Sequence, residues 1–281
     1  MEYKRELAAR ISQRAAACPD MDPSHLDQLL GRTLLIVAHP DDESISCGGL
    51  LQRIEQPCVL FATDGAPEDE YFWRKYGSRT AYAKLREDEA RAALRAVGVG
   101  AVEFLSHRVP APLVDQLLYK SLAPAFAALS SILEQFRPQC LLTLAYEGGH
   151  PDHDSVSFLS AQLGKVYSIP VWEAPLYHRS PTGQGMYQQF VREQGDVIEH
   201  PVKGSELEKK MQMLACYKSQ FDALPSFRPE LERFRPQAAY DYSRRPHEGK
   251  LNYEVWQWHM TPEEVCAAFV EFSAAAVPLE K

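Results

Sequence analysis

The chain has 281 residues, of which 45% are hydrophobic and 24% are charged, which is typical of a globular protein with one large α/β domain, or a domain plus a small appendage. The formal net charge of -8 disfavours nucleic acid as a partner, because an acidic surface repels the phosphate backbone. Because the chain lacks a bilayer-spanning apolar run, a signal-peptide core and a disulfide-like cysteine spacing, we expect a cytoplasmic protein without a membrane span.

Short apolar segments alternate with segments of helical periodicity over the first 163 residues. Strands are expected at 33–38, 58–62, 102–105 and 140–145, and helices at 48–55, 79–97, 117–136 and 154–163. This β-α-β-α order predicts an α/β fold with a parallel, doubly wound sheet.

The pattern changes after Pro170. One more strand is expected at 170–177, with helices at 205–219 and 261–275. Ser205, with Glu208 three residues later, is the expected cap of the first of these helices. The stretch 221–247 is rich in proline, arginine and aromatic residues without a clear period, which predicts a long ordered loop or lid. The expected boundaries are 1–281 for a single domain, 31–220 for its core, and 221–281 for the C-terminal lid or loop and closing helix.

The first polar motif is His39-Pro40-Asp41-Asp42-Glu43, directly after the first expected strand. In doubly wound folds, ligands bind outside the carboxyl ends of the strands, so this position suits a site. Histidine and aspartate are good zinc ligands. Three consecutive carboxylates also repel one another, and a bound cation would relieve that repulsion.

The second motif is His150-Pro151-Asp152-His153, after the fourth expected strand and a Glu147-Gly148-Gly149 loop. The first and fourth strands are neighbours in the usual order of such sheets, so we expect the two motifs to converge. A ligand pair from the first motif and one histidine from the second make a three-ligand site. Such a site leaves a position open for water, as catalytic zinc sites do.

Each motif is weak evidence alone, because a strand-end His-Pro is usually a turn, but their conjunction is specific. A nucleotide-binding Rossmann protein would need a glycine-rich phosphate loop, whereas Asp41, Asp42 and Glu43 would repel a pyrophosphate. A non-catalytic metal-binding module and an amidase acting on a larger conjugate both remain as alternatives.

The paired motifs resemble the signature of the PIG-L/LmbE-like deacetylases. Further likeness lies in Thr63-Asp64-Gly65, Arg86, Glu89 and Tyr217-Lys218-Ser219-Gln220, so the resemblance runs from about Thr33 to Gln220. It implies a Rossmann-like, mostly parallel sheet with helices on both faces. It also implies one Zn²⁺ ion, or another divalent transition metal, and hydrolysis of an N-acetyl group, often on an amino sugar.

The resemblance makes His39, Asp42 and His153 the zinc ligands and Asp41 the general base. It makes His150 the group that stabilises charge or protonates the leaving amine. Some members carry a tyrosine two residues before the equivalent of His150, where this chain has Gly148. Tyr146 is then either a replacement donor or a packed aromatic.

Behind the ligands, Asp152 is expected to orient a neighbouring histidine, and Glu43 to support the ligands or a helix N-terminus. Asp64 and Arg86 are substrate-side candidates, with a structural salt bridge as the alternative. The expected partner is a small N-acylated molecule. The remaining histidines are expected to be structural or on the surface: His25, His107, His178, His200, His247 and His259.

Overall fold

The computed structural model describes residues 26–193 and 195–276, and the prediction for His25 lies outside them. Within this part of the chain, a seven-stranded sheet has the order β3-β2-β1-β4-β5-β9-β8. Its strands are β1 (Arg32–Val37), β2 (Gln56–Phe61), β3 (Ala101–Phe104), β4 (Cys140–Leu144), β5 (Val171–Ala174), β8 (Ile198–Pro201) and β9 (Leu231–Pro236). The first five pair in parallel, whereas β9 pairs antiparallel with both β5 and β8, which confirms the mostly parallel sheet. A separate hairpin pairs β6 (Tyr177–Arg179) with β7 (Gly185–Tyr187).

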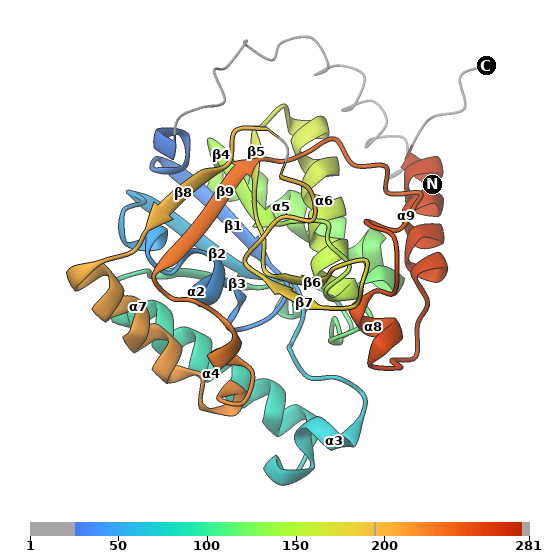
Figure 1. Cartoon of the computed structure of the whole chain (residues 1–281), viewed down its shortest axis with the longest axis horizontal. Coiled ribbons are helices and arrows are strands. Elements are labelled where there is room, and N and C mark those ends of the chain that lie inside the picture. Colours follow the sequence, from blue (N-terminus) through green and yellow to red (C-terminus); the bar gives the residue numbers. More distant parts are fainter. Residues whose placement is uncertain (1–25, 194, 277–281) are drawn as a thin grey trace.

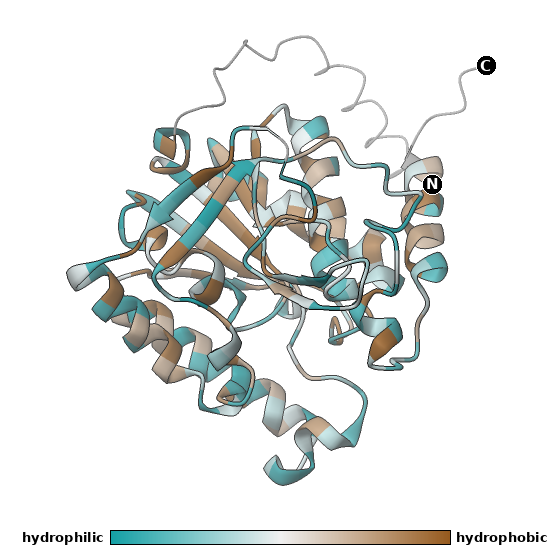
Figure 2. Cartoon of the chain, viewed as in Figure 1, coloured by the Kyte–Doolittle hydropathy of each residue, from teal (hydrophilic) through white to brown (hydrophobic). Residues whose placement is uncertain are grey.

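Helices flank the sheet on both faces. The longer ones are α4 (Arg79–Ala96), α5 (Leu122–Phe136), α6 (Pro151–Tyr167), α7 (Gly204–Cys216) and α9 (Pro262–Ala276), and the short ones are α2 (Asp42–Cys47), α3 (Glu70–Trp73) and α8 (Asn252–Val255). α4 packs with α7, whereas α5, α6 and α9 pack with one another (Figure 1). The central parallel strands are mainly hydrophobic, as Figure 2 shows, because a parallel sheet covered on both faces is buried. No helix in the described ranges is both long and apolar enough to cross a membrane.

Two helices begin earlier than the sequence predicts, and both begin inside a polar motif. α2 starts at Asp42, whereas the predicted 48–55 helix is only a 3₁₀ turn at Leu50–Gln52. α6 starts at Pro151, because proline is favoured at the first helical position and the His150 side chain accepts a hydrogen bond from the Asp152 N–H. Both motifs therefore lie at helix N-termini.

The late segment departs most from prediction. The predicted loop 221–247 contains β9, a strand of the main sheet. The charged residues of β9 obscured the strand pattern in the sequence. Two of them form buried ion pairs in the structure: Arg235 Nε lies 2.7 Å from Glu173 Oε1, and Glu232 Oε1 lies 2.7 Å from Lys210 Nζ. The predicted cap at Ser205 is wrong, since α7 starts at Gly204 without a side-chain cap.

Candidate active site

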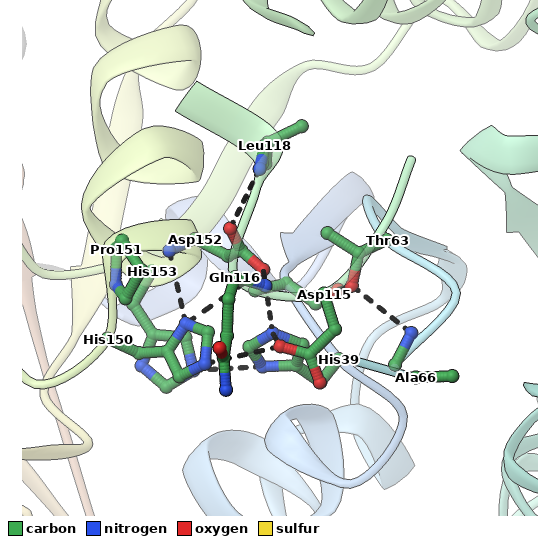
Figure 3. Close-up of polar contacts among 12 residues, drawn as sticks. His39, Thr63, Ala66, Asp115, Gln116, Leu118, His150, Pro151, Asp152 and His153 are labelled. Carbon is green, nitrogen blue, oxygen red and sulfur yellow. Dashed lines mark hydrogen bonds and ion pairs between the residues drawn. The ribbon is translucent and has the colours of Figure 1, made fainter. Parts of the chain in front are cut away.

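The two polar motifs lie side by side at the carboxyl edge of the sheet. β1 pairs directly with β4, as the expected strand order required. The residues that follow these strands converge, and Figure 3 shows His39, His150 and His153 grouped around Asp115 and Asp152. All five side chains are buried.

The backbone of the first motif is strained at Asp41, which has φ of 127°. Such a conformation costs about 1–3 kcal/mol in a residue other than glycine and is typical of functional sites. Two side-chain contacts hold it: Glu43 Oε2 accepts the Asp41 N–H at 3.2 Å, and Asp42 Oδ2 accepts the His39 N–H at 2.8 Å. Local hydrogen bonds thus set the direction of the Asp42 and Glu43 side chains.

Three side chains have the spacing of metal ligands. His39 Nδ1 lies 3.2 Å from His153 Nε2, and the two Asp42 oxygens lie 3.5 Å from His39 Nδ1 and 3.3 Å from His153 Nε2. Ligands at about 2.0–2.1 Å around a tetrahedral zinc ion are about 3.4 Å apart. The set His39, Asp42 and His153 therefore fits such an ion. His150, which belongs to an overlapping potential group with His39 and His153, is then left beside the metal position.

The far side of His39 faces two carboxylates. His39 Nε2 lies 3.1 Å from Asp152 Oδ2 and 3.3 Å from Asp115 Oδ1. Asp152 is fixed in turn by the N–H groups of Gln116 at 2.7 Å and Leu118 at 3.0 Å. A carboxylate behind a ligand histidine orients the ring and raises its basicity.

Sequence reasoning missed Asp115, which lies in the loop between β3 and α5 and belongs to no motif. The one sequence feature that could have indicated Asp115 is its position in the segment after the predicted strand 102–105. Burial alone would raise the pKa of Asp115, but the charge of His39 and the close approach of the His39 and His150 rings, each 3.3 Å from Oδ1, hold it well below its usual range. Asp115 is therefore an anion between the two histidines.

Hydrogen bonding defines the tautomer of His150. Its Nδ1 accepts the Asp152 N–H at 3.1 Å, so the proton of the neutral ring is on Nε2. Nε2 lies 3.3 Å from Asp115 Oδ1. Burial and the neighbouring His39 lower the pKa of His150, which favours this neutral form. The residue is therefore an N–H donor beside the metal position.

Arg86 holds the first motif from the side. Its guanidinium donates to Pro40 O at 2.5 Å and Gly65 O at 3.0 Å, and lies 3.3 Å from Asp41 Oδ1. Burial raises the pKa of Asp41 to about 8, although the charge of Arg86 opposes this shift. Arg86 thus joins the loops after β1 and β2 and also borders the pocket.

A pocket of about 360 Å³ opens over the polar cluster, a volume near the lower end for small-molecule sites. Its lining includes His39, Asp41, Asp42, Asp115 and His150.

Two predicted substrate residues do not lie in this pocket. Asp64 Oδ2 pairs with Arg79 at 2.8 Å, the structural salt bridge that was its alternative. Tyr146 packs against Tyr240 and Tyr242, and its hydroxyl donates to Arg244 O at 2.8 Å. The packed-aromatic alternative thus describes Tyr146.

The late Tyr217-Lys218-Ser219-Gln220 motif supports the site from behind. Tyr217 Oη donates to Glu43 Oε1 at 2.5 Å, and the other Glu43 oxygen accepts the Asp41 N–H. Ser219 donates its N–H and its hydroxyl to Glu89 on α4 at 3.0 and 2.6 Å. Through these hydrogen bonds the motif connects the strained backbone at Asp41 to helix α4.

Tyr177 occupies space that a side chain at 149 would need, and Leu251 occupies the space beside Gly148. A Cβ on Gly149 would lie 1.9 Å from Tyr177 O, and Gly148 has φ of 69° with Leu251 2.6 Å from its Cβ position. The Tyr177 ring lies edge-on to His153, with centroids 5.2 Å apart, and borders the pocket. Burial, and next the charge of Asp42, raise the pKa of the Tyr177 phenol well above its ordinary value, so it stays protonated.

Comparisons with known proteins show which proteins this chain is similar to. Residues 34–163 match the family model described as PIG-L: GlcNAc-PI de-N-acetylase. The chain is similar to 1D-myo-inositol 2-acetamido-2-deoxy-alpha-D-glucopyranoside deacetylases of Mycobacterium sp. (strain JLS), with 28% identity covering 59% of this chain and 60% of the relative. For the enzyme of that name from Geodermatophilus obscurus, the identity is 31% over 43% of this chain and 49% of the relative. The chain thus spans 60% or less of the length of these curated relatives.

Solved structures share the fold. A triple mutant of a deacetylase of the teicoplanin biosynthetic pathway has a TM-score of 0.58 and 19% identity, covering 75% of this chain and 99% of that one. The A40926 pseudoaglycone deacetylase has a TM-score of 0.54 and 21% identity, covering 74% and 99%. At these identities the likeness shows a common architecture.

Proposed function

We propose, from the premise that residues 34–163 form a PIG-L family segment, that this protein is a metal-dependent hydrolase. It removes an N-acyl group, in the first place N-acetyl, from an amino sugar or a related small molecule. One observation carries this proposal: His39 Nδ1, His153 Nε2 and the two oxygens of the Asp42 carboxylate approach one another to 3.2–3.5 Å, beside Asp41, a buried carboxylate outside the ligand set. The names of the curated relatives, which are deacetylases of an N-acetylated sugar, support the substrate class.

The proposed ligands are His39, Asp42 and His153, and the proposed ion is Zn²⁺, with another divalent transition metal as the alternative. A bound ion of this kind polarises an acyl carbonyl and lowers the pKa of water. Asp152 and Asp115 support the ligand His39 from its far side at 3.1 and 3.3 Å.

Asp41 is the proposed general base. It accepts the proton of the attacking water while the oxygen adds to the acyl carbon. A base is most effective when its pKa lies near the working pH, and burial brings the pKa of Asp41 to about 8. Arg86 and Glu43 hold Asp41 in place through its side chain and its N–H.

His150 is the proposed hydrogen-bond donor, through its Nε2–H, to the negative charge that develops at the reacting centre. When the carbon–nitrogen bond breaks, Asp41 returns to the leaving amine the proton that it took from water, and the acyl group departs as a carboxylate. Asp115 lies 3.3 Å from His150 Nε2 and orients the neutral ring. Tyr177 is the proposed hydrogen-bond donor to the carbonyl oxygen, in place of the tyrosine that Gly148 replaces.

Amine release tests the proposal. Metal-loaded protein is incubated with a panel of N-acetylglucosamine derivatives, and free amine and acetate are both measured. Asp41→Asn is expected to keep its metal and to lose about 10²–10⁴ in rate. The matched control is Asp88→Asn, because Asp88 is exposed on α4.

Three outcomes would contradict parts of the proposal. Near-normal turnover of Asp41→Asn would show that another group is the base. Activity confined to peptides, to esters or to larger conjugates would refute the substrate class. No amine release from any N-acyl compound, with metal bound, would favour a non-catalytic metal-binding module.

A further inference from the structure

One side of the pocket is built from aromatic rings. We call this set the aromatic wall, and it consists of Trp258, Trp256, Tyr177, Phe227 and Tyr187. All five residues lie outside the segment 34–163 that matches the family. The wall therefore belongs to the late segment of the chain, outside the range of the family match.

The rings of the aromatic wall form a continuous series from His150 outward. Trp258 lies 4.8 Å from the His150 ring and 5.0 Å from Trp256, between centroids. Tyr177 lies 6.3 Å from Trp256 and 6.1 Å from Phe227. Phe227 then contacts Tyr187 at 5.4 Å. A ligand bound next to His150 can therefore extend along this surface.

The outer rings are exposed although they are large and apolar. Trp256 is 45% exposed and Tyr187 is 42% exposed. Exposed apolar surface that continues into a cavity marks an interaction site. Aromatic faces gain most from planar or apolar groups laid against them.

The aromatic wall is also held in place before a ligand arrives. Glu147 Oε1 accepts the N–H groups of Leu176 and Tyr177 at 2.7 and 2.8 Å, which fixes the start of the β6 hairpin. The Trp256 N–H donates to Asn252 O at 2.8 Å at the end of α8. Rigid surfaces bind at a lower entropic cost.

Charge is concentrated at the floor of the pocket rather than along the aromatic wall. Among the described residues that line the pocket, the carboxylates and Arg86 belong to the polar cluster at its base. Arg179 is the one charged residue beside the wall, and its Nη1 donates to Gly183 O at 2.8 Å. The late arginines lie elsewhere: Arg233 pairs with Glu193, and Arg245 with Glu263. The wall therefore suits an uncharged group.

We propose that the aromatic wall is a binding subsite for an apolar, preferably planar, substituent of the N-acylated substrate. This inference rests on the proposed function, which it deepens by naming the substrate class. The substituent is either the group attached to the sugar through its glycosidic bond or an extended N-acyl chain. Both present the same apolar surface, and the experiment separates them.

The test compares substrates that differ only in one apolar group. In the first arm, benzyl and methyl glycosides of N-acetylglucosamine are compared. In the second arm, methyl glycosides that carry N-hexanoyl or N-acetyl are compared. The variants are Trp256→Ala and Trp256→Phe, with Phe221→Ala as control, because Phe221 is 54% exposed and does not line the pocket.

We expect kcat/KM to favour the apolar substrate by about tenfold, equivalent to about 1.4 kcal/mol, in one arm. Trp256→Ala should remove that preference, so that the apolar substrate and the methyl N-acetyl substrate have equal kcat/KM. Trp256→Phe and Phe221→Ala should keep it. No preference in either arm, or a preference that survives Trp256→Ala, overturns the inference.

A binding measurement separates this inference from the proposed function. If no substrate is hydrolysed, the proposed function fails, and calorimetry with the benzyl and N-hexanoyl compounds still tests the aromatic wall. Tighter binding than for the methyl N-acetyl compound, weakened about tenfold by Trp256→Ala, supports the subsite. Equal binding of all three compounds refutes it.

Discussion

Replacing Asp152 by asparagine perturbs the metal site without touching a proposed ligand. Asp152 Oδ2 accepts from His39 Nε2 at 3.1 Å and from the Gln116 N–H at 2.7 Å, while Oδ1 accepts the Leu118 N–H at 3.0 Å. Asparagine keeps the shape, but its NH₂ group must face at least one of these donors. Either His39 loses its partner, or a buried backbone N–H does.

The expected magnitude follows from the role of Asp152. Removing a hydrogen-bonded carboxylate behind a ligand histidine typically weakens metal binding by about 10–100-fold, which is about 1.4–2.7 kcal/mol. An additional loss of about 1–3 kcal/mol is expected in the metal-free protein, because an unpaired buried polar group is costly. The two effects must be measured separately.

Chemical denaturation with and without metal makes this separation. At a fixed free metal concentration, binding adds RT ln(1 + [L]/Kd) to the free energy of unfolding. The increment reports metal affinity alone, because the loss in the metal-free protein cancels. We expect the increment for Asp152→Asn to be smaller than for the parent by about 1.4–2.7 kcal/mol, and that for the exposed control Asp88→Asn to be unchanged. Equal increments for Asp152→Asn and the parent would refute the reasoning.

Three further substitutions test other contacts. Tyr217→Phe removes the 2.5 Å hydrogen bond to buried Glu43. It should lower the free energy of unfolding by about 1–3 kcal/mol in urea titrations, and it should also lower kcat. If both values are unchanged, Tyr217 does not support the site through Glu43. Lys210→Met leaves the Glu232 carboxylate, 1% exposed, without its cation, and should lower the free energy of unfolding by about 3–5 kcal/mol. A decrease below about 1 kcal/mol would show that the ion pair is not needed for stability. Tyr177→Phe should lower kcat by about 10²–10³ at unchanged metal content, and a normal kcat would remove it as the carbonyl donor.

Local periodicity in the sequence was enough to predict much of the fold. The strands β1, β2 and β4 are continuous apolar runs because both faces of the sheet are covered. Their alternation with helices specified parallel pairing, and parallel strands end at one edge of the sheet. The motifs at 39–43 and 150–153 therefore had to meet once β1 and β4 were neighbours, as they are.

Contacts between distant segments decided the rest, because such contacts leave no local pattern. Asp115 reaches His39 and His150 from a loop without a motif, and nothing near it in sequence marks it. β9 reads as polar, yet Arg235 is buried because Glu173 on the neighbouring strand neutralises it. Packing likewise placed Tyr146 in an aromatic cluster and Tyr177 at the pocket. Periodicity reports which face of an element is buried, whereas the partner of a buried charge or ring is set only when the chain folds back on itself.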